Sequence, residues 1–278
     1  MGKMLLHACC GPCSMEPVRL LRERGIEPCI YYANSNIHPA SEYAHRRDTI
    51  RDWAAKESVG FVEGAYDPDA WEATAGRVGE AAHERFGVIA DDHAADQIED
   101  QGGSLPTQLA HNPEALDARR ARCRACYRIR FEEAARYAAE NGYDTLGTTL
   151  SVSPYQYTDV IREELERACA GAGIEPMFED YRPFYDEATR RSRAEGLYRQ
   201  NFCGCRFSDE EAQVERAERK RVRDAAKAAE RAAHAAERAA EDAARAERKA
   251  ERAAYDKKQA RKRAVLKALR EQQRAQQQ

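Results

Sequence analysis

The stretch Lys3-Met-Leu-Leu-His-Ala-Cys-Cys-Gly-Pro-Cys-Ser-Met-Glu-Pro-Val-Arg-Leu-Leu-Arg-Glu-Arg-Gly25 decides the fold. Its first six residues form a short apolar run that predicts a buried strand, followed by a tight loop rich in cysteine. Pro17 suits the first turn of a helix, and Gly25 suits its end. A strand, a loop and a helix in this order are typical of the first unit of an α/β protein.

Strand and helix patterns continue to alternate along the chain. Strands are predicted at 29–33, 60–66, 143–152 and 175–181. Helices are predicted at 42–58, 123–141 and 158–171, and Tyr43, Ile50 and Trp53 share one face of the first of these. This alternation predicts an α/β fold with a parallel sheet and crossover helices.

Two segments depart from the alternation. Residues 78–119 are mostly polar, with Gly102, Gly103 and Pro106, and are predicted to be an insertion or lid. From Ser208 the chain is rich in Ala, Glu, Arg and Lys and lacks Gly and Pro, which predicts a long helical extension over 208–278. Its alanines follow a heptad from Ala225 to Ala253, compatible with self-association or with a solitary solvated helix.

Charge and hydropathy exclude some classes of protein. No segment reaches the roughly 20 apolar residues of a membrane helix, and the N-terminus is too short for a secretory signal. A cytoplasmic protein is therefore expected, whose thiols are kept reduced. The net charge is +6 from Ser208 onward and −9 before it, so the body does not indicate a nucleic-acid partner. Arginines between Arg119 and Arg130 nevertheless crowd around one cysteine pair as a local basic patch.

Nine cysteines are unevenly spaced, which indicates a metal-binding or redox-catalytic site. Cys9, Cys10 and Cys13 follow the first strand, and ligands of parallel sheets bind at the carboxyl ends of strands. Adjacent cysteines favour binding of two thiolates to different metal atoms. For Cys29 and Cys169, which stand alone, core packing is the expected role.

Two further pairs lie later in the chain. Cys123 and Cys126 are expected on one face at the start of a helix, where the helix N-terminus and nearby arginines would lower the thiol pKa. Together with Cys9 and Cys10 they would give four thiolates, which suit either zinc or a [4Fe–4S] cluster. Cys203-Gly204-Cys205 suits either a strained, labile disulfide or further metal ligands.

The blocks that contain these cysteines resemble the cobalamin-independent epoxyqueuosine reductases, the QueH family. They occur in the family's order and cover roughly residues 3–208. The blocks are His7-Ala-Cys-Cys-Gly-Pro-Cys-Ser14, Asn36-Ile-His-Pro39 with Glu42, Tyr43 and Arg46, Arg122-Cys-Arg-Ala-Cys-Tyr127, Thr148-Thr-Leu-Ser-Val-Ser-Pro154 and Leu197-Tyr-Arg-Gln-Asn-Phe-Cys-Gly-Cys-Arg-Phe-Ser208.

The resemblance implies a fold, a reaction and a set of site residues. It implies a Rossmann-like sheet of the adenine-nucleotide alpha hydrolase type in an iron–sulfur reductase domain, residues 1–207. The implied reaction reduces epoxyqueuosine at the tRNA wobble position to queuosine, with an electron donor as a further partner. The implied ligands of a [4Fe–4S] cluster are Cys9, Cys10, Cys123 and Cys126, with Cys13 helping to hold an additional iron. Cys203 and Cys205 match a redox-active disulfide.

Some roles and two alternatives stay open. His7, His38 and Tyr127 are candidate proton donors, and Tyr155 and Tyr157 are candidates for stacking on a base. One alternative is an ATP-dependent tRNA thiolase, but its Gly- and Ser-rich phosphate loop is replaced here by the cysteine loop. The other is a non-catalytic zinc-binding protein that acts through its long helix. The polar segment 78–119 looks longer than in the family, and the tail lies outside the resemblance.

Overall fold

The computed structural model describes residues 2–91 and 112–275, with side chains up to residue 267. Five strands form one sheet in the order β3-β2-β1-β4-β5, and all neighbouring strands are parallel. The strands are β1 (Met4–His7), β2 (Pro28–Tyr32), β3 (Gly60–Glu63), β4 (Thr145–Thr148) and β5 (Glu175–Met177). The predicted α/β fold with a parallel sheet is confirmed.

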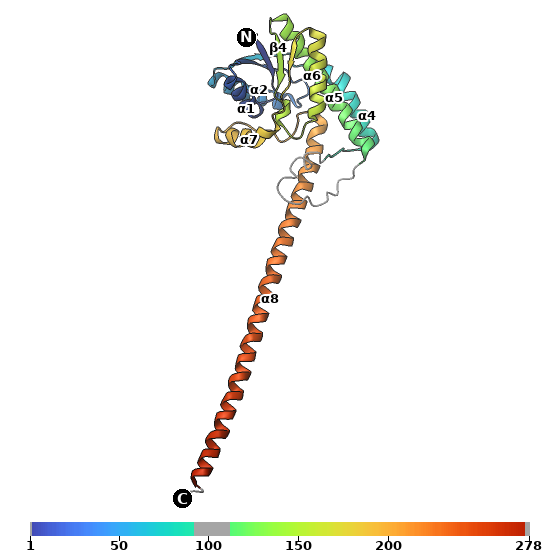
Figure 1. Cartoon of the computed structure of the whole chain (residues 1–278). Helices are drawn as coiled ribbons and strands as arrows, with labels where there is room; N and C mark the ends of the chain where they lie inside the picture. Colours follow the sequence, from blue (N-terminus) through green and yellow to red (C-terminus); the bar gives the residue numbers. More distant parts are fainter. Residues whose placement is uncertain (1, 92–111, 276–278) are drawn as a thin grey trace. The chain divides into compact units, whose positions relative to one another are not determined.

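Helices connect and follow these strands (Figure 1). They are α1 (Gly11–Glu23), α2 (Ala40–Lys56), α3 (Pro68–Trp71), η1 (Glu72–Gly76, a π turn), α4 (Arg77–Phe86), α5 (Pro113–Glu140), η3 (Leu150–Val152), α6 (Thr158–Ala172), η4 (Arg182–Phe184), α7 (Tyr185–Ala194) and α8 (Arg206–Ala275).

Each face of the sheet has its own core. Helices α1 and α2 cover one face, and α5 and α6 cover the other (Figure 1). Along β1 the side chains alternate, so that Leu6 joins the first core and Leu5 the second. A strand buried on both faces is apolar at every position, which explains why Met4-Leu5-Leu6 was recognisable from the sequence.

The start of α1 corrects one prediction. The helix begins at Gly11, with Pro12 in its first turn and Pro17 in its interior. The sequence pattern favours Pro17 as the first-turn proline, but Pro12, five residues after the end of β1, occupies that position. Cys13 therefore belongs to a helix rather than to a loop. The strand predicted at 143–152 is also shorter, because a 3₁₀ turn begins at Leu150.

Helix α5 begins ten residues earlier than predicted. Asn112 caps its N-terminus, where its side chain accepts hydrogen bonds from the backbone N–H groups of Glu114 (3.1 Å) and Ala115 (3.3 Å). An asparagine followed by a proline is a helix-start signal that the polar composition concealed. The predicted insertion at 78–119 is thus helical at both ends, and residues 92–111 lie outside the described residues.

The predicted long C-terminal helix is confirmed as α8. The chain forms two compact units, Met1–Arg219 and Lys220–Gln278, so that the first turns of α8 belong to the first unit. The division into a catalytic domain 1–207 and a tail 208–278 stays a prediction. Among the described helices, none has an apolar stretch that would span a bilayer.

Buried ion pairs fix the first turns of α8 against α5. Arg122 donates to both carboxylate oxygens of Glu211, at 2.7 and 2.8 Å. Arg119 donates to Glu215 at 2.6 Å, and the same oxygen accepts from the backbone of Asp91 at 3.1 Å. These four charged side chains are almost fully buried. Removing one partner from such a pair would leave an uncompensated buried charge.

We therefore expect Glu211→Ala to lower the free energy of unfolding by about 3–5 kcal/mol. Urea unfolding followed by tryptophan fluorescence measures this, because Trp53 and Trp71 both lie in the first unit. The control is Glu210→Ala, an exposed neighbour, expected to change stability by less than about 0.5 kcal/mol. Equal losses in the two variants would contradict the anchoring role of Glu211.

Candidate functional site

The sheet places the first cysteines at the point where its strand order reverses. Strand β1 lies between β2 and β4, and the chain leaves its carboxyl end directly into Cys9 and Cys10. The backbone N–H of Ala8 donates to Tyr31 at 3.0 Å, and the Asn34 side-chain amide donates to the carbonyl of Ala8 at 2.9 Å. This fixed loop sits where open parallel sheets bind ligands.

Three thiols meet in this loop and form a potential metal site. The sulfur atoms of Cys9, Cys10 and Cys13 all lie within 4.8 Å of one another, and the Cys9 and Cys10 sulfurs are 3.8 Å apart. Thiolates at roughly 2.3 Å from one tetrahedral metal would lie roughly 3.8 Å apart. The donor set and its spacing therefore fit a thiolate-bound metal.

The three thiols do not titrate alike. Hydrogen bonds from Cys13 and Cys9 hold the pKa of Cys10 well below its ordinary value, although burial opposes this. The Gln200 side-chain amide also donates to the Cys10 sulfur, at 2.9 Å. The pKa of Cys9 is raised to about 11 by its bond to Cys10, and that of Cys13 is raised further by both neighbours. The hydrogen bonds within this group therefore favour the thiolate form of Cys10 over those of Cys9 and Cys13.

Cys123 and Cys126 lie in the middle of α5, not at its start. The predicted lowering of their pKa is wrong, because the field of a helix N-terminus fades within the first turn. Burial raises the pKa of Cys123 to about 12, even though Arg122 and Arg119 oppose it. Burial likewise raises the pKa of Cys126 to about 11.

The structure brings these two thiols to different neighbours. Cys126 packs with Cys205 and Trp71, whereas Cys123 packs against the core that contains Cys9 and Cys10. Within the described ranges 2–91 and 112–275, the close sulfur group consists of Cys9, Cys10 and Cys13, and Cys123 and Cys126 are outside it. The four predicted cluster ligands therefore share one region of the protein without forming one tight group.

Arg130 connects the two sets of thiols. Its side chain is buried and donates to the Asn34 amide oxygen. Although burial disfavours its charge, the sulfurs of Cys126, Cys203 and Cys9 raise its pKa above the ordinary value. A fixed positive charge therefore lies beside cysteines from three separate segments, where it stabilises their thiolate forms.

The segment Cys203-Gly204-Cys205 is held by the loop after β2 and by α2. The Arg46 guanidinium donates to the carbonyl of Cys203 at 2.9 Å, and the backbone N–H of His38 donates to the carbonyl of Gly204 at 2.8 Å. Gly204 has a φ of 124°, and an added Cβ would lie 2.9 Å from Ile37. The glycine is therefore required by both conformation and space. Both thiols are free.

The arginines near Cys123 do not form the basic patch that their crowding predicted. Arg119, Arg122 and Arg130 are buried. The exposed ones are paired with carboxylates instead: Arg120 with Asp159, Arg124 with Glu163 and Glu164, and Arg128 with Glu164. Because their charges are matched locally, they offer little net attraction to a polyanion.

Two of the three predicted proton donors are unsuited to that role. Burial and the charge of Arg130 lower the pKa of His7 to about 3, and its ring nitrogens already contact Thr148 and the carbonyl of Ala33. Tyr127 is buried, donates to Gln156 at 2.6 Å and has a raised pKa. His38 keeps a quarter of its side chain exposed and stays a candidate.

The predicted stacking tyrosines differ from one another. Tyr157 is buried and donates to Asp91 at 2.8 Å, so it is a packing residue. Tyr155 is half-buried, with the Arg219 guanidinium 5.2 Å from its ring centre. Gln200 and Arg46 were not recognised as individual site residues. Both stand in the sequence blocks that carried the resemblance, which was the available signal.

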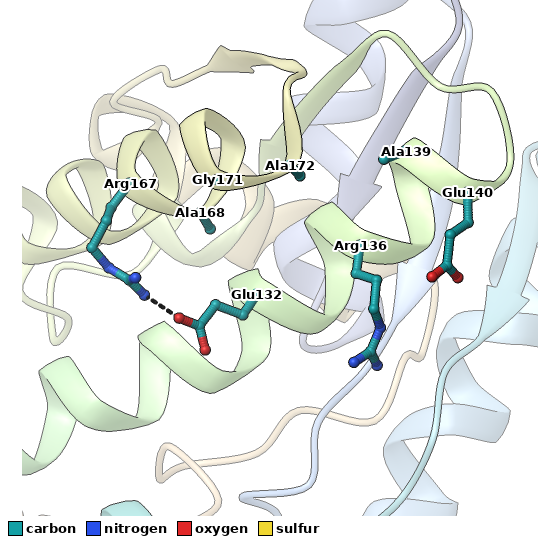
Figure 2. A pocket seen from close by; sticks show the side chains of 8 residues that line it. All are labelled: Glu132, Arg136, Ala139, Glu140, Arg167, Ala168, Gly171 and Ala172. Carbon is teal, nitrogen blue, oxygen red and sulfur yellow. Dashed lines mark hydrogen bonds and ion pairs between the residues drawn. The ribbon is translucent and has the colours of Figure 1, made fainter.

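A hollow lies between the carboxyl-terminal halves of α5 and α6, apart from the cysteine site (Figure 2). Small residues form its floor, and the Glu132–Arg167 ion pair of 2.7 Å crosses one end. These helix ends lead into the amino ends of β4 and β5, away from the cysteines. No cysteine lines this hollow, whose four charged residues are all exposed.

Known proteins of one family match this chain. A sequence model of the family described as "Epoxyqueuosine reductase QueH" matches residues 4–86 and 104–211. Three similar curated proteins bear this name. The one from Acinetobacter baylyi is 30% identical over 210 residues, covering 74% of this chain and 80% of the relative. The one from Histophilus somni is 31% identical and covers 74% of this chain and 72% of the relative. The one from Thermotoga maritima is 27% identical and covers 80% of this chain and 98% of the relative.

We expect Gly204→Ala to destabilise the protein by roughly 1–3 kcal/mol, because alanine is strained at this φ and its Cβ meets Ile37. The measurement is the free energy of unfolding in urea. Gly171→Ala is the matched control, since that glycine lies within α6 with open space around it, and should stabilise by about 0.5–1 kcal/mol. A neutral Gly204→Ala would show that the segment is not held as described.

Proposed function

The chain belongs to the epoxyqueuosine reductase QueH family, and we propose that its cysteine centre reduces the wobble epoxyqueuosine of tRNA to queuosine. It is an oxidoreductase of queuosine biosynthesis. The group of three sulfurs at the carboxyl end of β1 is the observation that carries the proposed location of the chemistry. The cysteines of α5 and of the Cys-Gly-Cys segment border the same region.

A [4Fe–4S] cluster is the proposed cofactor, with Cys9, Cys10, Cys123 and Cys126 as its ligands. Cys13 would help to hold an additional iron. In support, all five sulfurs come from one region of the molecule, and Cys10 already has a lowered pKa. When bound, such a cluster supplies single electrons, and an iron with an open position polarises oxygen.

Cys203 and Cys205 are the proposed redox-active pair. Reduction of an epoxide to an alkene breaks both C–O bonds, takes up two electrons and two protons, and releases water. Oxidation of two thiols to a disulfide yields the same two electrons and two protons. The reaction therefore balances with the dithiol as the donor, and an external electron donor would then reduce the disulfide. Arg46 and Gly204 hold the two cysteines in place for this exchange.

Two other functions compete with this proposal. The zinc alternative is favoured by the 3.8 Å between Cys9 and Cys10, which also suits a single zinc ion. The ATP-dependent thiolase is disfavoured by Pro12, because proline removes one of the free backbone N–H groups with which a helix N-terminus binds phosphate.

Several finer features remain part of the proposal. The five-stranded parallel sheet is compatible with the adenine-nucleotide alpha hydrolase type. Residues 1–207 are proposed as the reductase domain and 208–278 as the helical tail, acting in the cytoplasm. The alanine heptad from Ala225 to Ala253 is compatible with self-association through that tail.

Metal analysis tests the proposed ligands. We expect the anaerobically purified protein to be brown, to contain about four or more irons and to bleach with dithionite. Cys9→Ala and Cys123→Ala should lose this spectrum, whereas Cys169→Ala, a core cysteine of α6, should keep it. Stoichiometric zinc in a colourless protein, even after reconstitution with iron and sulfide, would exclude the cluster.

Replacement of Cys205 separates electron transfer from metal binding. We expect Cys205→Ala to keep the iron content and spectrum but to reduce epoxyqueuosine in tRNA at least about 100-fold more slowly over repeated turnovers. Cys29→Ala, a strand cysteine on β2, is the matched control and should retain activity. If Cys205→Ala turned over at the wild-type rate, the redox role of the pair would be wrong.

A further inference from the structure

The second unit, from Lys220 onward, carries its positive charge on one side. With 3.6 residues per turn, each residue of a helix advances by about 100°. Eleven of the sixteen lysines and arginines between 220 and 267 fall within one third of the circumference. We name them the basic stripe: Lys220, Arg223, Lys227, Arg231, Arg238, Arg245, Arg248, Lys249, Arg252, Arg263 and Lys267.

The acidic residues do not follow the same distribution. Only Glu230, Glu241 and Asp256 share that third of the helix, whereas the other two thirds hold five basic and five acidic residues. The stripe side therefore has a net charge of +8, and the rest of this segment is neutral. The alanines of the heptad, from Ala225 to Ala253, lie on the side away from the stripe.

The charges of the stripe are exposed and available. Every residue of the basic stripe is exposed. Between Arg223 and Lys267 the described side chains form a single ion pair, His234–Glu237, which includes no stripe residue. Seven of the eleven stripe residues have a carboxylate three or four residues away in the sequence, as Arg245 has in Glu241, but the described side chains of the stripe do not close these pairs.

The two units have opposite charge. Residues 1–219 contain 27 Lys and Arg against 39 Asp and Glu, a net charge of −12. Residues 220–278 contain 18 against 9, a net charge of +9. An acidic body repels a polyanionic substrate at long range, so an enzyme of tRNA gains from a basic surface elsewhere in the chain.

We propose that the basic stripe binds the phosphate backbone of tRNA. This rests on the proposed function, since it assigns a binding surface to the same substrate. From Lys220 to Lys267 the helix is about 70 Å long at 1.5 Å per residue. Its eleven charges are spread along this length, on average about 7 Å apart, and form the linear array that a nucleic-acid backbone complements.

Other occupants suit this surface less well. Helices that lie on membranes carry large apolar residues such as Trp, Phe and Leu opposite their basic face, whereas alanine dominates here. A second copy of the chain could pack against the alanine side, but that contact would leave the basic stripe on the other side uncovered. The match to the family model ends at residue 211, so the stripe lies beyond the part of the chain that this model covers.

Two variants that each remove four positive charges, one on the stripe and one outside it, test the basic stripe. The variant R231Q/R238Q/R245Q/R252Q removes four stripe charges from the full-length protein. The control K257Q/K258Q/R261Q/K262Q removes four charges from other sides of the same helix. Binding of an unmodified tRNA transcript is measured over a salt series, and circular dichroism confirms that both variants keep their helix content.

We expect the stripe variant to bind at least about tenfold more weakly and its salt slope to fall by about 3, as for four lost phosphate contacts. The control should change both quantities much less. Equal losses in the two variants, or no loss in either, would overturn the proposal. So would unchanged tRNA affinity combined with loss of binding to vesicles of anionic phospholipid.

Reductase assays separate this inference from the proposed function. The stripe variant should keep its kcat on epoxyqueuosine-containing tRNA and show a raised KM. If the wild-type protein bound tRNA through the stripe but reduced no epoxyqueuosine, the proposed function would fail and the inference would stand. If it reduced epoxyqueuosine while the stripe variant bound normally, the inference would fail and the function would stand.

Discussion

Buried arginines of α5 hold the candidate site together, because each finds its partner on a distant segment of the chain. Arg122 and Arg119 contact carboxylates at the start of α8, and Arg130 contacts Asn34 after β2. A guanidinium is costly to bury, and only a matched partner in good geometry compensates for its lost hydration. Such contacts tolerate few alternative arrangements. They therefore fix where Cys205 lies relative to Cys126 and where the first cysteine loop lies relative to α5.

The part of this structure that depends on local pattern could be predicted from the sequence. Apolar runs and helical periodicity located the five strands and most helices, and the rule that parallel strands end at one edge placed Cys9 and Cys10 at the site. The buried arginines could not be predicted, because arginine is normally exposed and its crowding in the sequence predicts a basic surface patch. Arg122 and Glu211 are 89 residues apart, and no local signal connects them.

The predicted start of α5 was wrong, and the predicted sign of the pKa shifts of Cys123 and Cys126 was therefore wrong too. Moving the start of α5 from residue 123 to Pro113 shifts the N-terminus by about 15 Å along the axis at 1.5 Å per residue. At that distance the helix end no longer stabilises a thiolate, and burial determines the sign of the pKa shift. The charge state of Cys123 and Cys126 therefore depends on what replaces lost hydration, which here includes Arg122 and Arg130.

The distribution of charge beyond Arg219 has no explanation in packing. Alanine, glutamate, arginine and lysine are among the best helix formers, so this helix does not require a buried face for its stability. Packing therefore does not dictate which positions around the helix axis carry acidic residues and which carry basic ones. An order selected for helix stability alone would alternate acidic and basic residues one turn apart. Instead, eleven of the sixteen basic residues between 220 and 267 lie on one third of the helix, whereas the acidic residues are spread evenly around it, and the body of the chain is net acidic. The uneven distribution of the basic residues supplies attraction to an external anion, as the proposed binding of tRNA requires.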